Sequence, residues 1–443
     1  MREPLVAGRD TAHDERLVRC AVVLAAGRGL RMRSDQPKVL RRVGGVSLLE
    51  RAVHVLRSAG VDRVAVVVGY RGESVVKAVR AKGLPVEVVY NPEWERGTAT
   101  SVVAGVRAAV GERCLVVMGD HVFEADDVER LLASPGHTVV ALDRDPERQF
   151  GGLAGARATR MRVGRDGRVL TLGDHLDDYD GVDAGLAVVN IKDLLALAST
   201  SAEASWDDLR RSLIARGCEI RACEVGGLWA DIDTPESIRA LERALWRRYG
   251  PKPTDGIIAR VVNRRISGPL TRLLLRTGIT PDTATYLAFA LTAAAAGLVA
   301  TGQRPLLIVG GLAILLGSAL DGVDGELARV SGRASRRGAV LDTLLDRYAD
   351  LGVVVGLVLA AGGTSFAWTW GFVTGAGCLL VSYVHAVGRD TDVRLLLRRE
   401  FRLLIFAVAA VTGLPLWGLI VVGVAANLDV VRGVVLLLRA TRS

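Results

Sequence analysis

The sequence predicts two unlike parts: an α/β Rossmann-like domain, followed by an all-α integral membrane domain of about six transmembrane helices. Short apolar runs alternate with amphipathic stretches between residues 20 and 249, whereas long runs of Leu, Val, Ala and Gly occur only after about residue 280. Half of the 443 residues are hydrophobic, and 57 Lys and Arg stand against 48 Asp and Glu. The arginines of the second part lie between the apolar runs and form no single basic stripe, so the basic excess favours a membrane protein and excludes nucleic acid as a partner.

The N-terminal residues 1–19 are charged and contain no apolar stretch of signal-peptide length. We therefore expect a short N-terminal lead and a first domain that stays in the cytoplasm. The cysteines are odd in number and scattered, so the sequence indicates neither a disulfide framework nor a zinc site. They are Cys20, Cys114, Cys218, Cys223 and Cys378.

Residues 20–249 alternate strand-like and helix-like segments. The apolar runs read CAVVLAAG, RVAVVVG, VEVVY, CLVVMGD and TVVALD, and helical spacing occurs in SLLERAVHVLRSAG and SVVAGVRAAVGE. This pattern predicts a mostly parallel sheet with helices on both faces, and a ligand site beyond the carboxyl ends of the strands. The Pro- and Gly-containing stretch YGPKPTDG ends this domain.

The remaining residues are predicted to form a linker with an interfacial helix over 250–281 and a membrane domain over 282–443. The basic amphipathic stretch IIARVVNRRISGPLTRLLLRTG is typical of a helix that lies on a membrane surface. The six expected spans cover residues 283–301, 306–328, 339–360, 366–387, 402–413 and 417–438. Arginines concentrate in the loops after the second and fourth spans, so we expect both termini in the cytoplasm and a multi-pass protein of the cell inner membrane.

The first chemical motif is LAAGRGLRM at residues 24–32, followed by a Pro-Lys pair that ends at Lys38. Gly27 and Gly29 have no side chain to keep backbone N–H groups away from a triphosphate, and Arg31 and Lys38 supply positive charge. A strand that ends in such a turn is typical of a phosphate-binding cradle.

This motif resembles the signature of the sugar-phosphate nucleotidyltransferases. Three further segments match that family in order: Arg96–Ala99, Gly119–Asp120 and Trp229–Asp231. The resemblance implies that Lys38 and Arg31 act on the phosphates. It also implies Mg²⁺, with Mn²⁺ as an alternative, held by Asp120 and Asp231, with Asp233 as the rival for the second ligand. The nucleotide-binding residues implied by the family are Leu24, Ala25, Ala26, Gly27, Gly29, Gly97 and Thr98.

The segment DGRVLTLGDHLDDYDGVDAGLAVVN resembles the acceptor-binding part of the same family. The resemblance implies that Asp183 and Gly185 contact a polyol phosphate. Relatives tend to carry a lysine near the position of Asp174 or His175, and this sequence has none there. We interpret His175 and His121 as surface or strand-end residues.

The second motif lies at Asp321–Asp346 and reads DGVDGELARVSGRASRRGAVLDTLLD. Carboxylates three or four residues apart share one helix face, so two pairs of aspartates on successive helices predict four acids at one site. Near a membrane boundary such acids repel one another unless a divalent cation holds them, and oxygen ligands favour Mg²⁺ or Mn²⁺. Asp350 extends the stripe by one turn but falls outside the motif.

These residues match the signature of the CDP-alcohol phosphotransferases at every fixed position. The resemblance implies that Asp321, Asp324 and Asp342 bind metal and that Asp346 binds metal or acts as the general base. Residues implied to contact substrate are Gly325, Arg329 and Gly338. Three further arginines fit either an anionic acceptor or the positive-inside rule: Arg333, Arg336 and Arg337.

A domain that releases CMP needs a CDP-linked donor, so the neighbouring nucleotidyltransferase is expected to use CTP. The whole chain resembles the fused CTP:inositol-1-phosphate cytidylyltransferases and di-myo-inositol-phosphate phosphate synthases. That resemblance implies inositol 1-phosphate, CTP and CDP-inositol as substrates, an osmolyte as product, and the dimers common in the membrane family. Two alternatives remain open: a phospholipid synthase with a fused cytidylyltransferase for another headgroup, and a chain in which one domain is a silent tether.

Overall fold

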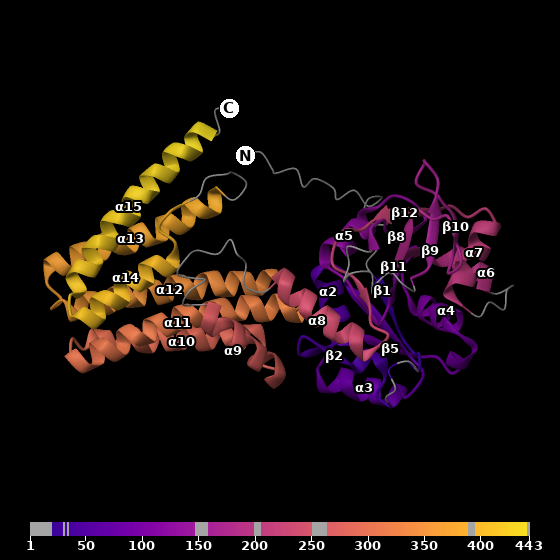
Figure 1. Ribbon diagram of the computed structural model, residues 1–443, viewed down its shortest axis with the longest axis horizontal. Coiled ribbons are helices and arrows are strands. Elements are labelled where there is room, and N and C mark those ends of the chain that lie inside the picture. The colour runs from indigo at the N-terminus through magenta and orange to yellow at the C-terminus, as the bar shows by residue number, and fades with distance from the viewer. Residues whose placement is uncertain are drawn as a thin grey trace, which may run out of the picture. The chain divides into compact units, whose positions relative to one another are not determined.

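A computed structural model describes residues 20–29, 32, 35–146, 158–198, 205–249, 264–388 and 395–440. The chain divides into two compact units between Arg248 and Tyr249, the N-terminal unit and the C-terminal unit (Figure 1). Each is described by itself below. Residues 250–263 of the predicted linker and interfacial helix over 250–281 lie outside the described residues, as do residues 1–19 and Arg31.

The N-terminal unit contains a mixed nine-stranded sheet whose main path runs β10-β9-β11-β6-β1-β4-β5, with β8 and β12 joined to it through β11. The β5-β4-β1-β6 half is parallel, as predicted, whereas β11 pairs antiparallel with β6, β8 and β9. Strands β9, β10 and β11 follow one another without an intervening helix, and strands joined in this way pair antiparallel. The strands are β1 Cys20–Ala25, β4 Arg63–Val68, β5 Glu87–Tyr90, β6 Arg113–Met118, β8 Thr138–Asp143, β9 Arg160–Val163, β10 Val169–Gly173, β11 Gly181–Asn190 and β12 Ile220–Glu224.

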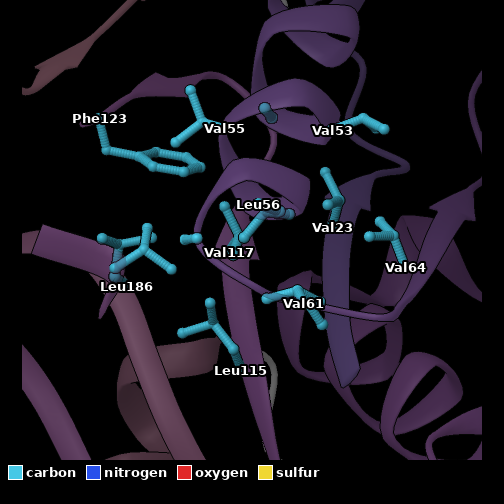
Figure 2. Close-up of a cluster of buried hydrophobic side chains, with 14 of the residues drawn as sticks. Val23, Val53, Val55, Leu56, Val61, Val64, Leu115, Val117, Phe123 and Leu186 are labelled. Atoms are coloured by element: carbon cyan, nitrogen blue, oxygen red, sulfur yellow. The ribbon is translucent and has the colours of Figure 1, made fainter. Parts of the chain in front are cut away.

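Helices cover both faces of this sheet, as the sequence predicted. All six residues of β1 are buried, and alternate side chains face opposite sides because a strand has a period of two. Val23 belongs to the apolar cluster under α2, α3 and α5, whereas Val22 belongs to the cluster under α4, α6 and α7. Figure 2 shows the first cluster, with Val23 and Val117 of the sheet near Leu56 of the helix layer. The helices are α2 Leu48–Ser58, α3 Gly72–Ala81, α4 Thr98–Ala108, α5 Ala125–Ala133, α6 Ile191–Ala198, α7 Trp206–Ala215 and α8 Pro235–Tyr249.

The carboxyl end of β6 lies against the end of β1. The Gly119 N–H donates to the Leu24 carbonyl at 3.0 Å, and a Cβ on Gly119 would lie 2.4 Å from that oxygen. Only glycine permits this approach. Beyond it, the short strands β7 (His121–Val122) and β13 (Ala230–Asp231) pair antiparallel, with His121 opposite Asp231. Residues far apart in sequence are thereby fixed next to one another.

The C-terminal unit is helical. Its helices are α9 Arg264–Thr277, α10 Pro281–Ala300, α11 Arg304–Ser331, α12 Arg336–Ala360, α13 Ser365–Val387, α14 Arg399–Thr412 and α15 Pro415–Ala440 (Figure 1). Six of them, α10 to α15, occupy the positions expected for spans. Among the described residues, however, only α10, α11, α13 and α15 are long and apolar enough to cross a membrane, so the predicted count of six spans is not confirmed. Charged side chains run through the first half of α12, and the 14 residues of α14 extend about 21 Å, less than the ~30 Å hydrocarbon core.

The helices of this unit pack closely and expose apolar side chains outward. A Cβ on Gly356 of α12 would lie 2.6 Å from the Ala296 carbonyl of α10, so these helices approach through a glycine. On the outside, Phe372, Trp417 and Leu428 are more than half exposed. Large exposed apolar side chains on apolar helices indicate a surface suited to lipid.

Candidate active sites

The phosphate-cradle motif lines a cavity of about 420 Å³ at the carboxyl end of β1. Gly29 has a φ of +60°, and a Cβ there would lie 3.0 Å from the Lys38 Cβ, so the turn requires glycine. Every residue predicted to bind the nucleotide lines this cavity. They are Leu24, Ala25, Ala26, Gly27, Gly29, Gly97 and Thr98, joined by Lys38, Trp94, Asp120 and Asp233.

Lys38 is buried at the centre of three carboxylates. Its Nζ lies 2.5 Å from Asp120 Oδ2, 2.6 Å from Asp233 Oδ1 and 3.4 Å from Asp231 Oδ1. Burial alone would lower the pKa of Lys38, but Asp120 and Asp231 raise it above its usual value. Lys38 therefore carries a permanent positive charge beside the cavity. Both predicted candidates for the second carboxylate, Asp231 and Asp233, reach the same ammonium group.

The pKa values of Asp120 and Asp231 shift in opposite directions. Burial would raise the pKa of Asp120, but the Lys38 ammonium and the His121 ring outweigh it and lower that pKa. Burial raises the pKa of Asp231, and the neighbouring Asp120 adds to the shift. For His121, burial would lower the pKa, and Asp231 and Asp120 raise it instead. Negative charge is thus in excess around the His121 ring, which favours a bound cation or proton there.

One side of this cluster has the composition of a metal site. Asp120, His121 and Asp231 each offer a ligand atom, and these atoms lie within 4.8 Å of one another. Asp120 Oδ1 is buried and has no hydrogen-bond partner among the described residues. An unsatisfied carboxylate oxygen fits a divalent cation. His121 lies at the start of β7, a strand end as interpreted, but its side chain is mostly buried beside the acids and not on the surface. The pairing of β7 with β13 that places it there leaves no signal in the local sequence.

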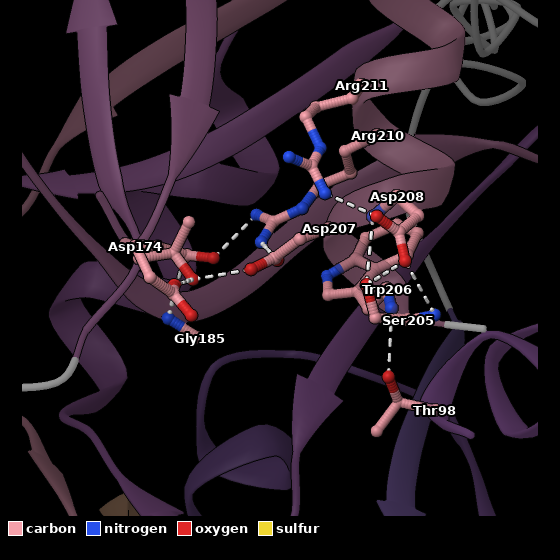
Figure 3. A network of polar contacts seen from close by, with 11 residues as sticks. Thr98, Asp174, Gly185, Ser205, Trp206, Asp207, Asp208, Arg210 and Arg211 are labelled. Carbon is pink, nitrogen blue, oxygen red and sulfur yellow. Dashed lines mark hydrogen bonds and ion pairs between the residues drawn. The ribbon is translucent and has the colours of Figure 1, made fainter. Parts of the chain in front are cut away.

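Asp183, predicted to contact the acceptor, bonds to Arg210 in a buried polar network, of which Figure 3 labels Gly185, Asp207 and Arg210. Its Oδ2 accepts a hydrogen bond from Arg210 Nη1 at 2.5 Å, and its Oδ1 accepts one from the Gly185 N–H at 2.8 Å. Arg210 also pairs with Asp207 and lies over the Trp206 ring, 5.0 Å from its centroid. No sequence motif indicated a role for Arg210. Both oxygens of Asp183 are already bonded within the protein, and its contact with a polyol phosphate stays a prediction.

The buried Arg210–Asp183 pair predicts that substitutions of Arg210 and of its neighbour Arg211 differ in their effect on stability. We expect Arg210→Met to lower the free energy of unfolding by about 3–5 kcal/mol, because it leaves the Asp183 carboxylate buried and unpaired. Arg211 pairs with Asp208 from a half-exposed position, so Arg211→Met should cost only about 0–1 kcal/mol. Urea titration followed by circular dichroism measures both. Equal costs would show that the Asp183 pair is not a structural anchor.

The C-terminal unit brings together three of the four motif acids. Asp321 of α11 and Asp342 and Asp346 of α12 offer oxygens within 4.8 Å of one another. Asp342 Oδ1 is buried without a hydrogen-bond partner among the described residues, which fits a divalent cation. Asp324 is not in this group of three: its Oδ2 accepts a hydrogen bond from Thr285 at 2.5 Å.

Arg399, at the start of α14, lies between these acids. Its Nη1 is 2.8 Å from Asp321 Oδ1 and 2.9 Å from Asp346 Oδ1, and its Nε donates to Asp350 Oδ1 at 2.9 Å. Arg402, one turn later, lies 3.4 Å from Asp350 Oδ2. The sequence suggested Arg399 only as a loop charge and left Asp350 outside the site. The spacing of Asp342, Asp346 and Asp350, each four residues from the next, was the available signal.

The predicted substrate contacts of this unit lie beside the acids in sequence. The Arg329 guanidinium passes Gly325, where a Cβ would lie 3.1 Å from its Nη1. The Gly338 N–H donates to Ser335 Oγ at 3.0 Å and so caps the start of α12. Gly325 thus leaves room for the Arg329 guanidinium, and the Gly338 N–H takes part in capping the start of α12.

Comparison with known proteins also divides the chain into an N-terminal and a C-terminal part. A family model for the MobA-like NTP transferase domain matches residues 21–175, and one for CDP-alcohol phosphatidyltransferase matches residues 278–431. A protein of Rubrobacter xylanophilus named "Bifunctional IPC transferase and DIPP synthase" is 42% identical over 433 residues, 95% of this chain and 96% of its own length. A protein of the same name from Thermococcus kodakarensis is 33% identical over 74% of this chain and 73% of its own. Among solved structures, the inositol-1-phosphate CTP transferase from T. maritima covers 50% of this chain and 91% of its own, with a TM-score of 0.45 and 26% identity.

Proposed function

Because the chain belongs to the family of bifunctional IPC transferase and DIPP synthase proteins, we propose that it catalyses two consecutive reactions. The N-terminal unit converts CTP and inositol 1-phosphate into CDP-inositol and pyrophosphate. The C-terminal unit transfers phosphoinositol from CDP-inositol to a second inositol 1-phosphate, which yields di-myo-inositol phosphate phosphate and CMP, for osmolyte synthesis. The observation that carries the proposal is the relationship at 42% identity over 95% of the chain, which includes both acidic clusters.

In the first reaction, two anions must meet: the phosphate of inositol 1-phosphate and the α-phosphate of CTP. The glycine turn exposes backbone N–H groups to the triphosphate, and Lys38 and Arg31 offset its charge. Asp120 and Asp231 are the residues that would hold Mg²⁺, which supplies further charge neutralisation when bound. The buried ion pairs of Lys38 support this role, since they fix the ammonium beside the cavity.

In the second reaction, a hydroxyl of the acceptor attacks the β-phosphate of CDP-inositol and CMP leaves. Asp321, Asp324 and Asp342 would hold Mg²⁺ on the pyrophosphate, and Asp346 would take the hydroxyl proton. Arg399 contacts both Asp321 and Asp346, so its charge offsets repulsion within the acidic cluster. This pairing supports a site that keeps its acids close together before substrate arrives.

We place the second reaction at a membrane. Four apolar helices support a membrane-spanning C-terminal domain over residues 282–443, preceded by a linker and interfacial helix over 250–281. The cytidylyltransferase domain over 20–249 would lie in the cytoplasm, behind the N-terminal lead over 1–19, and the protein in the inner membrane as a multi-pass homodimer. The charge distribution between apolar segments supports this orientation.

Membranes that contain the protein, incubated with CTP and labelled inositol 1-phosphate, test the proposal. We expect a labelled, water-soluble product with two inositol groups, formed together with CMP. A chloroform-soluble labelled product would replace the proposal with phospholipid synthesis. Accumulation of CDP-inositol alone would assign the C-terminal unit a tethering role. Membranes without the protein are the control.

A further inference from the structure

We propose that His121 is the third ligand of the divalent cation held by Asp120 and Asp231, and that the cytidylyltransferase site is therefore a mixed oxygen and nitrogen site. The inference rests on the proposed function, because it concerns the cation of that reaction. In a purely carboxylate site only oxygen atoms contact the metal, whereas in this mixed site a nitrogen atom contacts it as well. A metal–nitrogen bond can be measured directly.

A hydrogen bond to Ala184 fixes the tautomer of the His121 ring. His121 Nδ1 lies 3.1 Å from the Ala184 carbonyl oxygen, which can only accept, so Nδ1 carries the hydrogen. In the neutral ring the lone pair is then on Nε2, at the edge that faces the acids. A backbone carbonyl on the other nitrogen is the usual partner of a metal-binding histidine.

The distances from His121 Nε2 to the two acids fit a shared ion. His121 Nε2 lies 3.7 Å from Asp231 Oδ1 and 4.0 Å from Asp120 Oδ1. Both separations are too long for a hydrogen bond. They suit ligands of one shared ion, because metal bonds of about 2.0–2.2 Å from each atom can meet in the space between them.

The two oxygens of Asp120 have different surroundings. Lys38 takes Oδ2 at 2.5 Å, whereas Oδ1, the atom nearer His121, is buried and without a hydrogen-bond partner in the described part of the chain. The ammonium and a divalent cation can therefore use different oxygens of one carboxylate. His121 Nε2 would take one of the positions that a cation held by two carboxylates otherwise leaves to water or substrate.

The His121 ring is held in place by Gly185 and Trp229. A Cβ on Gly185, whose φ is +81°, would lie 2.0 Å from His121 Nδ1, so glycine alone lets the ring occupy this position. On another side the Trp229 ring stacks at 6.0 Å with an interplanar angle of 28°. Trp229 is itself fixed, because its Nε1 donates to the buried Asp143 at 2.6 Å. Such outer support is typical of a prepared metal ligand.

The experiment uses the full-length protein in detergent, freed of metal and labelled with ¹⁵N-histidine, with Mn²⁺ as the probe. Pulsed electron paramagnetic resonance should detect a ¹⁵N nucleus bonded to Mn²⁺. The signal should disappear in His121→Gln, and Mn²⁺ affinity of the N-terminal site should fall about tenfold or more. In His175→Gln, a matched change at an exposed histidine of the same unit, signal and affinity should be unchanged. The acid group Asp321, Asp342 and Asp346 offers only oxygen and adds no nitrogen signal.

Absence of ¹⁵N coupling in the unsubstituted protein would overturn the proposal, and this result needs no variant to fold. Coupling that survives in His121→Gln would overturn it as well. CDP-inositol formation, assayed in the same preparation, separates this inference from the proposed function. An active protein without coupling refutes only the histidine ligand, whereas coupling in a protein that makes no CDP-inositol refutes only the assigned reaction.

Discussion

Asp120→Asn should reduce CDP-inositol formation at least about a hundredfold while leaving transfer from supplied CDP-inositol unchanged. Asp120 bonds Lys38 through one oxygen and presents the other, unpaired, to the cation position. Asparagine keeps the size of the side chain but removes its charge, so the cation loses one of its two carboxylates and the ammonium loses one of its three. The loss should appear in the rate constant of the reaction, because charge neutralisation is needed most as the two phosphates approach.

The measurement is release of labelled pyrophosphate from CTP, with CMP release from supplied CDP-inositol as the internal control. Loss of both activities to the same extent would contradict two separate sites. If the variant still released pyrophosphate, Asp120 would not be a metal ligand. The proposed nucleotidyl transfer at this cavity would then lack its metal site.

Asp346→Asn should impair the second reaction and leave the first unchanged. We expect CMP release to fall by about 10²–10⁴-fold, because the change removes the group assigned to accept the hydroxyl proton and one negative charge of the acidic cluster. It also removes the charge that Asp346 contributes to the contact with Arg399 Nη1. CDP-inositol should still form and should accumulate, since nothing in the N-terminal site has changed.

Chromatography of the labelled products after incubation with CTP and inositol 1-phosphate reads out this variant. Asp120→Asn serves as its matched control, since each substitution removes one carboxylate charge from one site only. If Asp346→Asn protein still converted CDP-inositol to the di-inositol product, Asp346 would be neither base nor metal ligand.

The sequence predicted much of the fold because its signals are local. The run at β1 is apolar at every position and is buried on both faces, and the neighbouring runs became β4, β5, β6 and β8. The antiparallel part around β11 depends on how strands without crossover helices pair, which apolar periodicity does not record. The predicted number of spans is not confirmed. An apolar run shows that a helix exists, whereas crossing also requires length and few charges, and among the described residues α12 and α14 do not meet both conditions.

In the candidate sites, too, some residues could be predicted from local sequence signals and others could not. Asp321, Asp342 and Asp346 lie on two successive helices, so spacing alone brings them together. Asp120 and Asp231 are distant in the chain, and only family resemblance linked them before the pairing of β7 with β13 was known. His121 and Arg399 have no motif of their own. Their importance arises from tertiary contacts: the ring stacks on Trp229, and the guanidinium meets acids from two other helices.

Removal of divalent metal, with each half-reaction measured separately, tests the central claim most directly. The claim is that each unit works by holding a cation on its own acidic cluster. Purified full-length protein stripped of metal should make neither CDP-inositol from CTP nor CMP from CDP-inositol, and added Mg²⁺ should restore both, but only the first in Asp346→Asn. Undiminished turnover of either reaction in the stripped protein would contradict the account for that unit.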